Sequence, residues 1–157
     1  MAPRLNPHYA SPKSMEELIS FQEFAAASEF DPRLIEIVCI HVSGLNRCEQ
    51  GICRHMQRAL ELGESEERLQ LLPVWKQAPP LYSRREQAAL AWAEAVTQVA
   101  VDVTDREFQD AREWYTEEEL VELTLIVLAT SASNRMAISF GWRSVAPIAQ
   151  KTDQHQE

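Results

Sequence analysis

Hydrophobic residues recur along the chain at the three- and four-residue spacing of helices that bury one face. Ile35, Val38, Val42 and Leu45 follow this spacing, which places them on one side of a helix because an α-helix turns once every 3.6 residues. The chain has only 4 glycines, and no run of alternating β-branched residues indicates a strand. The pattern predicts an all-α protein, with about seven helices at roughly 14–27, 32–43, 47–62, 66–72, 84–99, 105–114 and 117–140.

Helix starts are marked by side chains that can cap the first turn. In a capping box, a Ser or Thr hydroxyl and a Glu carboxylate three residues later each accept a hydrogen bond from a free backbone N–H. Four pairs have this spacing: Ser14 with Glu17, Ser83 with Glu86, Thr104 with Glu107, and Thr116 with Glu119. Asp31 before Pro32 predicts a further start, with the carboxylate as N-cap and the proline in the first turn.

The segment from Leu120 to Ala129 is apolar on nearly every side. A helix without a polar face is covered all round by its neighbours, and in a chain this short we expect another subunit to provide part of the cover. Three prolines between residues 73 and 80 predict a loop within a single domain of residues 1–157. Residues 1–13 and 145–157 are rich in Pro, Ser, Gln and charge, and we expect flexible arms there.

The charge of the chain and its lack of long apolar segments limit the kinds of partner it is expected to bind. The net charge of -9 and the pI near 5.0 argue against nucleic acid or an anionic membrane, because phosphate binding depends on Lys and Arg. No stretch is expected to span a bilayer, since the best candidate, Leu123–Ala129, is flanked by Glu122 and Arg135. The N-terminus lacks the apolar core of a signal peptide, so we expect a cytoplasmic protein. Three cysteines, an odd number, do not favour a structural disulfide framework.

Candidate chemistry lies between residues 36 and 55. We expect Gly44 to end the helix that carries Glu36, and Asn46 to cap the next one. Cys48 would then lie in the first turn, where free N–H groups and the helix dipole lower the pKa of a thiol. His55 shares that helix face but lies about 10 Å further along the axis, too far for a direct hydrogen bond to Cys48. Glu36 beside His55 would form an acid–base couple.

Gly51 lies one turn from both Cys48 and His55. Glycine inside a helix costs about 1 kcal/mol relative to alanine, so a reason for it is expected. Two explanations remain open. Another helix packs closely at this position, or the missing side chain leaves room for a ligand or water between the thiol and the imidazole.

The other polar candidates have structural explanations as well. Cys48 fits a small apolar filler as well as a reactive thiol. Cys39 and Cys53 are interpreted as core residues, Cys39 less securely because it shares the face of Glu36. Arg135 interrupts the last apolar helix, and either forms a structural salt bridge or binds an anion beside the site.

A metal site is not favoured by the spacing of the possible ligands. Cys48, Cys53, His55 and His41 splay around their helices, and no compact Cys-x2-Cys or His-x3-His pattern occurs among them. We therefore expect no metal and no cofactor.

Glu36, Cys48 and His55, followed by Ala59-Leu60-Glu61-Leu62-Gly63, resemble the alkylhydroperoxidase D-like branch of the carboxymuconolactone decarboxylase family. Residues 4–7, 88–95 and 134–140 resemble the usual flanks of that family, so the resemblance covers most of the chain. It implies an all-helical fold that assembles as homotrimers or homohexamers.

In the peroxidase members of that family, a Cys-x2-Cys-x3-His motif reduces organic hydroperoxides and is regenerated by a thiol reductant. The second cysteine attacks the peroxide, the first resolves the product, and a glutamate and the histidine manage protons. By position, Glu36, Cys48 and His55 match the glutamate, the resolving cysteine and the histidine. The attacking cysteine falls on Gly51. The resemblance thus implies an antioxidant, peroxidase-like protein whose thiol-dependent activity is altered or lost.

Three functions stay open. The first is an altered hydroperoxidase that uses Cys48 as a single thiol. The second is an acid–base enzyme, because the decarboxylase members lack the cysteine pair and share a segment that resembles residues 55–60. In it, Glu36 and His55 move protons on a small lactone or carboxylic acid, and Arg135 holds an anionic group. The third is a non-catalytic oligomeric scaffold. The predicted site is Glu36, Cys48 and His55 for catalysis, with Gly51 and Arg135 for substrate binding.

Overall fold

The structure is a computed structural model that describes residues 4–98 and 102–141. Within these ranges every regular element is helical, which confirms the predicted fold class. The elements are α1 (Pro7–Ala10), α2 (Pro12–Ala26), α3 (Pro32–Leu45), α4 (Glu49–Glu61), α5 (Glu66–Leu71), η1 (Leu72–Gln77), η2 (Pro79–Leu81), α6 (Arg84–Thr97), α7 (Asp105–Arg112) and α8 (Glu117–Phe140).

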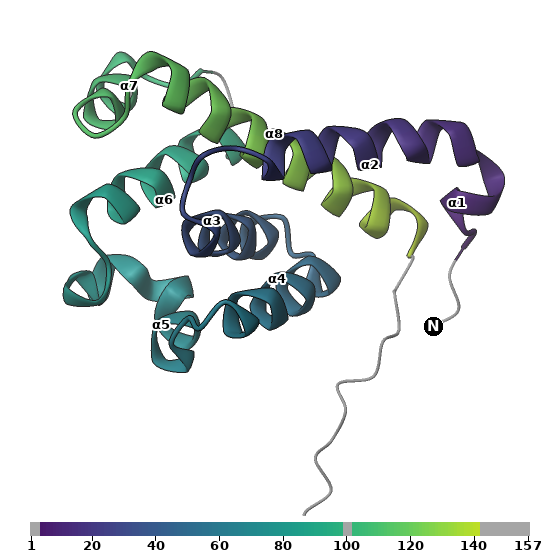
Figure 1. The fold of residues 1–157 in the computed structure, drawn as a ribbon, viewed down its shortest axis with the longest axis horizontal. Coiled ribbons are helices and arrows are strands. Elements are labelled where there is room, and N and C mark those ends of the chain that lie inside the picture. The colour runs from purple at the N-terminus through teal and green to yellow at the C-terminus, as the bar shows by residue number, and fades with distance from the viewer. Residues whose placement is uncertain (1–3, 99–101, 142–157) are drawn as a thin grey trace, which may run out of the picture.

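Helix α3 is the centre of the bundle. It packs against α4, α6 and α8, whereas α2 packs chiefly along α8 (Figure 1). The main core forms where α3, α6 and α8 meet, and Val38, Val42, Leu90, Leu123 and Val127 are almost completely buried there or next to it. These residues lie on the apolar faces that the spacing predicts, so burial of those faces organises the fold.

Most predicted helix starts are confirmed. Both halves of the capping box are present at the three starts predicted from Ser83, Thr104 and Thr116. Asp31 also caps α3, since its carboxylate accepts from the backbone N–H of Arg33 at 2.9 Å. The predicted box at Ser14 is wrong, because α2 begins at Pro12. Proline fits the first helical turn, where its missing N–H has no partner to lose.

The predicted arm at residues 1–13 is wrong for the part that the structure describes. This segment forms α1 and the start of α2. The backbone N–H of Arg4 donates to the carbonyl of Phe140 at 2.8 Å, and its guanidinium donates to the carbonyl of Ser139 at 3.0 Å. These carbonyls belong to the last turn of α8, where helix oxygens lack partners within the helix. The predicted arm at 145–157 lies outside the described residues.

Helix α8 corrects the expectation that no stretch could span a bilayer. Its length and a mean hydropathy of 1.3 would permit it to cross a membrane, alone among the helices of the described ranges. In the fold it packs against α2, α3 and α6. Its apolar character is therefore that of a central helix in a bundle.

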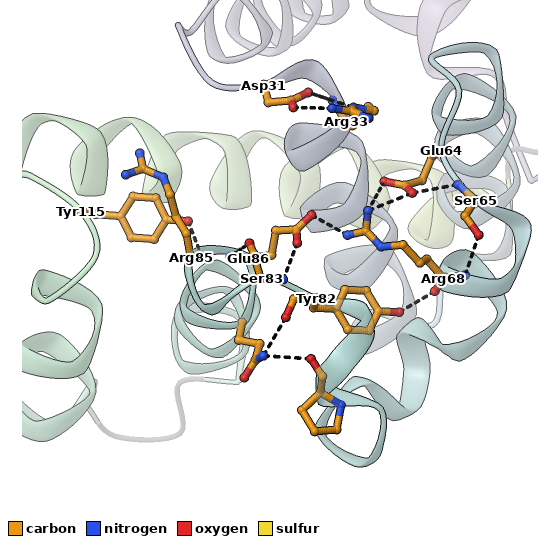
Figure 2. A network of polar contacts seen from close by, with 12 residues as sticks. Asp31, Arg33, Glu64, Ser65, Arg68, Tyr82, Ser83, Arg85, Glu86 and Tyr115 are labelled. Atoms are coloured by element: carbon orange, nitrogen blue, oxygen red, sulfur yellow. Dashed lines mark hydrogen bonds and ion pairs between the residues drawn. The ribbon is translucent and has the colours of Figure 1, made fainter.

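A polar network connects α5 with α6 and with the segment that follows α4 (Figure 2). The guanidinium of Arg68 donates to both carboxylate oxygens of Glu64 at 3.0 Å, and a second nitrogen reaches Glu86. The hydroxyl of Tyr82 donates to the backbone carbonyl of Arg68. Glu64 is buried, so its charge requires this partner. The network fixes the segment that follows α4 and thereby supports the helix that carries His55.

Candidate functional site

Glu36 and His55 form a buried hydrogen-bonded pair between α3 and α4. The Nδ1 atom of His55 lies 2.6 Å from Oε2 of Glu36, and the two residues are 7% and 4% exposed. Because α3 and α4 pack along each other, the two side chains meet across the helix interface. The structure thus brings together two of the three predicted catalytic residues.

Two arginines of α4 complete the polar cluster. Arg58 Nε lies 3.3 Å from the other Glu36 oxygen, and Arg54 Nη2 lies 3.2 Å from Nε2 of His55. A guanidinium can only donate, so Nε2 accepts and the Nδ1 proton is donated to Glu36. This arrangement fits a neutral imidazole of one defined tautomer. Neither arginine was predicted from the sequence, although their positions next to His55 and one turn after it carried a signal.

The pair lies on the wall of an open pocket of about 590 Å³ that is lined mainly by residues of α2, α3, α4 and α8. The charged residues that α3 and α4 contribute to its lining are Glu36, Arg54, His55 and Arg58. The remaining wall is largely apolar and includes Leu18, Ile19, Ile35, Ile126 and Met136. An apolar pocket of this size with a few convergent polar groups is typical of small-molecule sites.

A second cavity of about 590 Å³ lies elsewhere, near the start of α3 and the first turn of α8. Its polar lining consists mainly of carboxylates, among them Glu29, Glu118 and Glu122, together with Arg85. The described residues that line it include no histidine or cysteine, and so provide no imidazole or thiol group. We therefore place the candidate site at the cavity of Glu36 and His55.

Cys39 lies in the wall of the site cavity, next to Thr130. Its Sγ atom is 3.2 Å from the threonine Oγ1. Burial raises the pKa of the Cys39 thiol to about 12. The thiol therefore stays protonated at neutral pH, and a protonated thiol is a poor nucleophile. Cys39 is buried as predicted, but it also faces the cavity.

Cys48 lies at the boundary of α4 and away from the cavity lining. It is the N-cap residue and is buried, with its backbone N–H bonded to the carbonyl of Ser43 at 2.9 Å. The predicted boundary is displaced, because α3 continues past Gly44 and ends with Asn46 as its C-cap. The turn is made instead by Arg47, whose φ of 57° is left-handed. No residue of this junction is among those that line the site cavity in the described part of the chain.

The space expected at Gly51 is filled. A Cβ atom at this position would lie 2.5 Å from Oδ1 of Asn134 and 2.6 Å from Oγ of Ser43. The amide of Asn134 also donates to Ser43 Oγ at 3.1 Å, so the three helices α3, α4 and α8 meet there. The explanation by close packing is confirmed, and the expectation of a hollow between Cys48 and His55 is wrong.

The two other predicted polar residues lie outside the cavity. Arg135 is exposed on α8 and forms no ion pair within the described residues, so the structural salt bridge considered for it is not observed among them. Cys53 is exposed rather than in the core, because α4 turns it toward solvent. No group of three or more His, Cys, Asp or Glu side chains that could hold a metal ion occurs within residues 4–98 and 102–141.

Residues 12–95, more than half of the chain, match the model of the carboxymuconolactone decarboxylase family. The chain is 30% identical over 147 residues to the uncharacterized protein YdfG of Bacillus subtilis, in an alignment that covers 93% of this chain and 99% of that protein.

Two solved structures share the fold. One is a protein of unknown function from Agrobacterium tumefaciens, suggested to be the antioxidant defence protein AhpD. It is 28% identical with a TM-score of 0.86, over 92% of this chain and 99% of that one. The other is an alkylhydroperoxidase AhpD core from Ralstonia eutropha, a peroxidase-related protein. It is 18% identical with a TM-score of 0.77, over 91% and 77% of the two chains. At that identity the likeness concerns the fold alone.

Proposed function

Since the chain belongs to the carboxymuconolactone decarboxylase family and has the AhpD-like fold, we propose that it is an acid–base enzyme. In this proposal Glu36 and His55 move a proton on a small lactone or carboxylic acid, and dithiol-dependent reduction of hydroperoxides is lost. The observation that carries it is the 2.6 Å contact between His55 and Glu36 on the wall of a largely apolar cavity of about 590 Å³.

The pair has the parts that proton transfer requires. Imidazole accepts and returns protons near neutral pH. Glu36 orients the ring through Nδ1 and stabilises the imidazolium that forms when Nε2 takes a proton. Both side chains are themselves buried, and the lower effective dielectric of a buried position strengthens the interaction between the carboxylate and the charged ring.

The thiols support the loss of the peroxidase cycle. The attacking cysteine of that cycle would occupy position 51, where Ser43 and Asn134 already fill the space. Cys48 is buried away from the cavity lining. Cys39 faces the cavity, but its raised pKa keeps it protonated. A dithiol therefore cannot assemble at this site.

Assembly into homotrimers or homohexamers is part of the proposal. Val121, Leu128 and Ile138 leave apolar surface exposed along α8, and burying such a surface against another copy is favourable. Light scattering coupled to gel filtration measures the subunit number directly, and a monomer at micromolar concentration would contradict this part.

The catalytic proposal is tested with a panel of small lactones and carboxylic acids. For any compound that is turned over, Glu36→Gln and His55→Ala should each reduce kcat at least about 100-fold, the usual range for general acid–base groups. Cys48→Ser should leave kcat unchanged. His41→Gln is the matched control, since it alters a buried histidine paired with a glutamate outside the cavity. If Glu36→Gln and His55→Ala are folded, as judged by circular dichroism, and are as active as the wild type, the proposal is ruled out.

A second candidate is reduction of organic hydroperoxides with Cys48 as a single thiol, favoured by the similarity to the Agrobacterium tumefaciens protein. It predicts turnover of an organic hydroperoxide in excess dithiol, and loss of that turnover in Cys48→Ser. If neither assay shows turnover that depends on these residues, the chain is a non-catalytic scaffold.

A further inference from the structure

Both ring nitrogens of His55 are occupied. Nδ1 is bonded to Glu36, and Nε2 accepts from Arg54 at 3.2 Å. A general base needs a free lone pair on the nitrogen that takes the proton. The Arg54 guanidinium must therefore leave Nε2 before His55 can act, a requirement that rests on the proposed acid–base role of His55.

Arg54 is placed so that it can move. Its side chain is exposed, whereas the imidazole that it covers is buried. The two arginines at positions 54 and 58 lie one turn apart on α4, and both line the cavity. Arg58 is partly neutralised by Glu36. Arg54 has no ion pair within the described ranges, and the exposed Glu23 is the other carboxylate in the cavity lining.

We propose that Arg54 is an anion-released cap on His55. In this mechanism the carboxylate of a ligand draws the guanidinium away from Nε2 and pairs with it, with Arg58 beside it. Planar bidentate pairing makes a carboxylate a better partner for a guanidinium than a neutral imidazole is. The base is thus uncovered only when an anionic ligand is present.

The rest of the cavity defines the other half of the ligand. Leu18 and Ile19 of α2 and Ile126 and Met136 of α8 give the cavity apolar lining beside the charged cluster. The ligand class is therefore an amphipathic monocarboxylate, whose head lies at Arg54 and Arg58 and whose aliphatic or aryl body lies against α2 and α8. In the chemical step, a proton moves from an acidic C–H of the ligand to Nε2, and the electron pair of that bond stays on the ligand. The resulting imidazolium is balanced by the Glu36 carboxylate.

The test uses octanoate as a probe and octanamide as its neutral counterpart, with binding followed by calorimetry. The wild type should bind octanoate saturably and at least about 10-fold more tightly than octanamide. Arg54→Gln should weaken octanoate binding about 10-fold or more, and Arg54→Lys should do so less. Arg135→Gln is the matched control, since Arg135 is an exposed arginine outside the cavity, and it should bind like the wild type.

The release of Arg54 from Nε2 is measured by the ¹⁵N chemical shifts of the His55 imidazole. Octanoate should move the Nε2 resonance of His55 and leave the proton on Nδ1. In Arg54→Gln, the same resonance should already lie at its octanoate-bound position without ligand. Absence of saturable octanoate binding, equal binding by wild type and Arg54→Gln, or an Nε2 resonance that does not respond to bound octanoate would each overturn the proposal.

Neither measurement requires turnover, so the two proposals fail separately. If the resonance and affinity behave as described but Glu36→Gln keeps full activity on every substrate found, the cap stands and the acid–base function fails. If Glu36→Gln loses activity but Nε2 does not respond to octanoate, the function stands and the cap fails.

Discussion

His41 Nε2 lies 3.1 Å from Oε1 of Glu94, so α3 contributes to a second histidine–glutamate pair on the side toward α6, in which the histidine is buried and the glutamate is half-buried. Trp75 donates its indole N–H to the same carboxylate oxygen at 2.9 Å, and Lys76 bonds the other oxygen. His41 is absent from the lining of the site cavity as far as the chain is described. Residue types alone therefore do not distinguish the pair that lines the cavity from the pair that does not, and only the cavity makes Glu36 and His55 the candidate site.

The pair at His41 predicts a pH dependence of stability. Burial lowers the pKa of His41 below its usual 6.5, although the charge of Glu94 opposes this. The unfolded chain thus takes up a proton near pH 6.5 that the folded chain does not, so stability is lost as pH falls below that value. His41→Gln keeps an N–H donor for Glu94 but cannot titrate. Its Tm should fall less than that of the wild type between about pH 7.5 and 5.5.

Thermal unfolding followed by circular dichroism at several pH values measures this difference. Burial raises the pKa of the Glu94 carboxyl, but hydrogen bonds from Lys76 and Trp75 outweigh this effect and hold the pKa below its usual 4.5. Its contribution is lost only at lower pH. Parallel Tm curves for the wild type and His41→Gln above pH 5.5 would show that His41 does not cause the effect.

Two glycines that both lie in helices should respond oppositely to alanine. In Gly51→Ala, the new methyl group would overlap Asn134 and Ser43, and overpacking costs about 1–3 kcal/mol. Better helix propensity offsets about 1 kcal/mol of this, so a net loss on the order of 1 kcal/mol is expected. Gly44→Ala meets nothing within 4 Å and should stabilise the protein by about 0.5–1 kcal/mol. Urea unfolding gives both free energies, and a shift of the same sign in both variants would contradict the packing at Gly51.

Thiol labelling should separate the cysteines by exposure. Cys53 is exposed, while Cys39 and Cys48 are buried. A maleimide at neutral pH should therefore modify one thiol per folded chain quickly, and all 3 cysteines after denaturation. Cys53→Ser should remove the fast phase, as mass spectrometry of the labelled protein would show. Fast labelling of Cys48 in that variant would mean that its thiol is accessible, and would favour the single-thiol hydroperoxidase.

The ion pair between Glu64 and Arg68 should contribute strongly to stability. Arg68→Met leaves the carboxylate of Glu64, whose side chain is 3% exposed, without its cation, which should cost about 3 kcal/mol. The double variant Glu64→Gln with Arg68→Met should lose clearly less than the sum of the two single losses. The exposed pair of Arg106 and Asp110 is the control, and Arg106→Met should change stability little. Additive effects at Glu64 and Arg68 would show that the two side chains are not coupled.

The sequence predicted those features that depend on neighbours close in the chain. The caps at Asp31, Ser83, Thr104 and Thr116 need only a side chain and the N–H groups two or three residues later. The meeting of Glu36 and His55 was also predictable, because two consecutive helices joined by a short turn pack side by side.

Features that depend on distant residues were not predictable in this way. The environment of Gly51 is set by Ser43 and Asn134, which are 91 residues apart. The direction of Cys53 depends on how α4 rotates against α3 and α8, and the spacing of apolar residues in α4 is too sparse to fix it. Arg54 became a candidate only when the cavity beside it was known. The hydrogen bonds between Arg4 and the last turn of α8 join residues that are far apart in the sequence. Local composition therefore indicated an arm at the N-terminus instead.

The placement of α2 separates the wall of the cavity from its reactive groups. The carboxylate and the imidazole are carried by α3 and α4, whereas much of the opposite wall comes from α2, which packs chiefly along α8. Substitutions such as Leu18 or Ile19 to other sizes can therefore reshape the wall without displacing Glu36 or His55. In the proposed enzyme, the choice of ligand could therefore be altered by varying one helix while the acid–base pair is left in place.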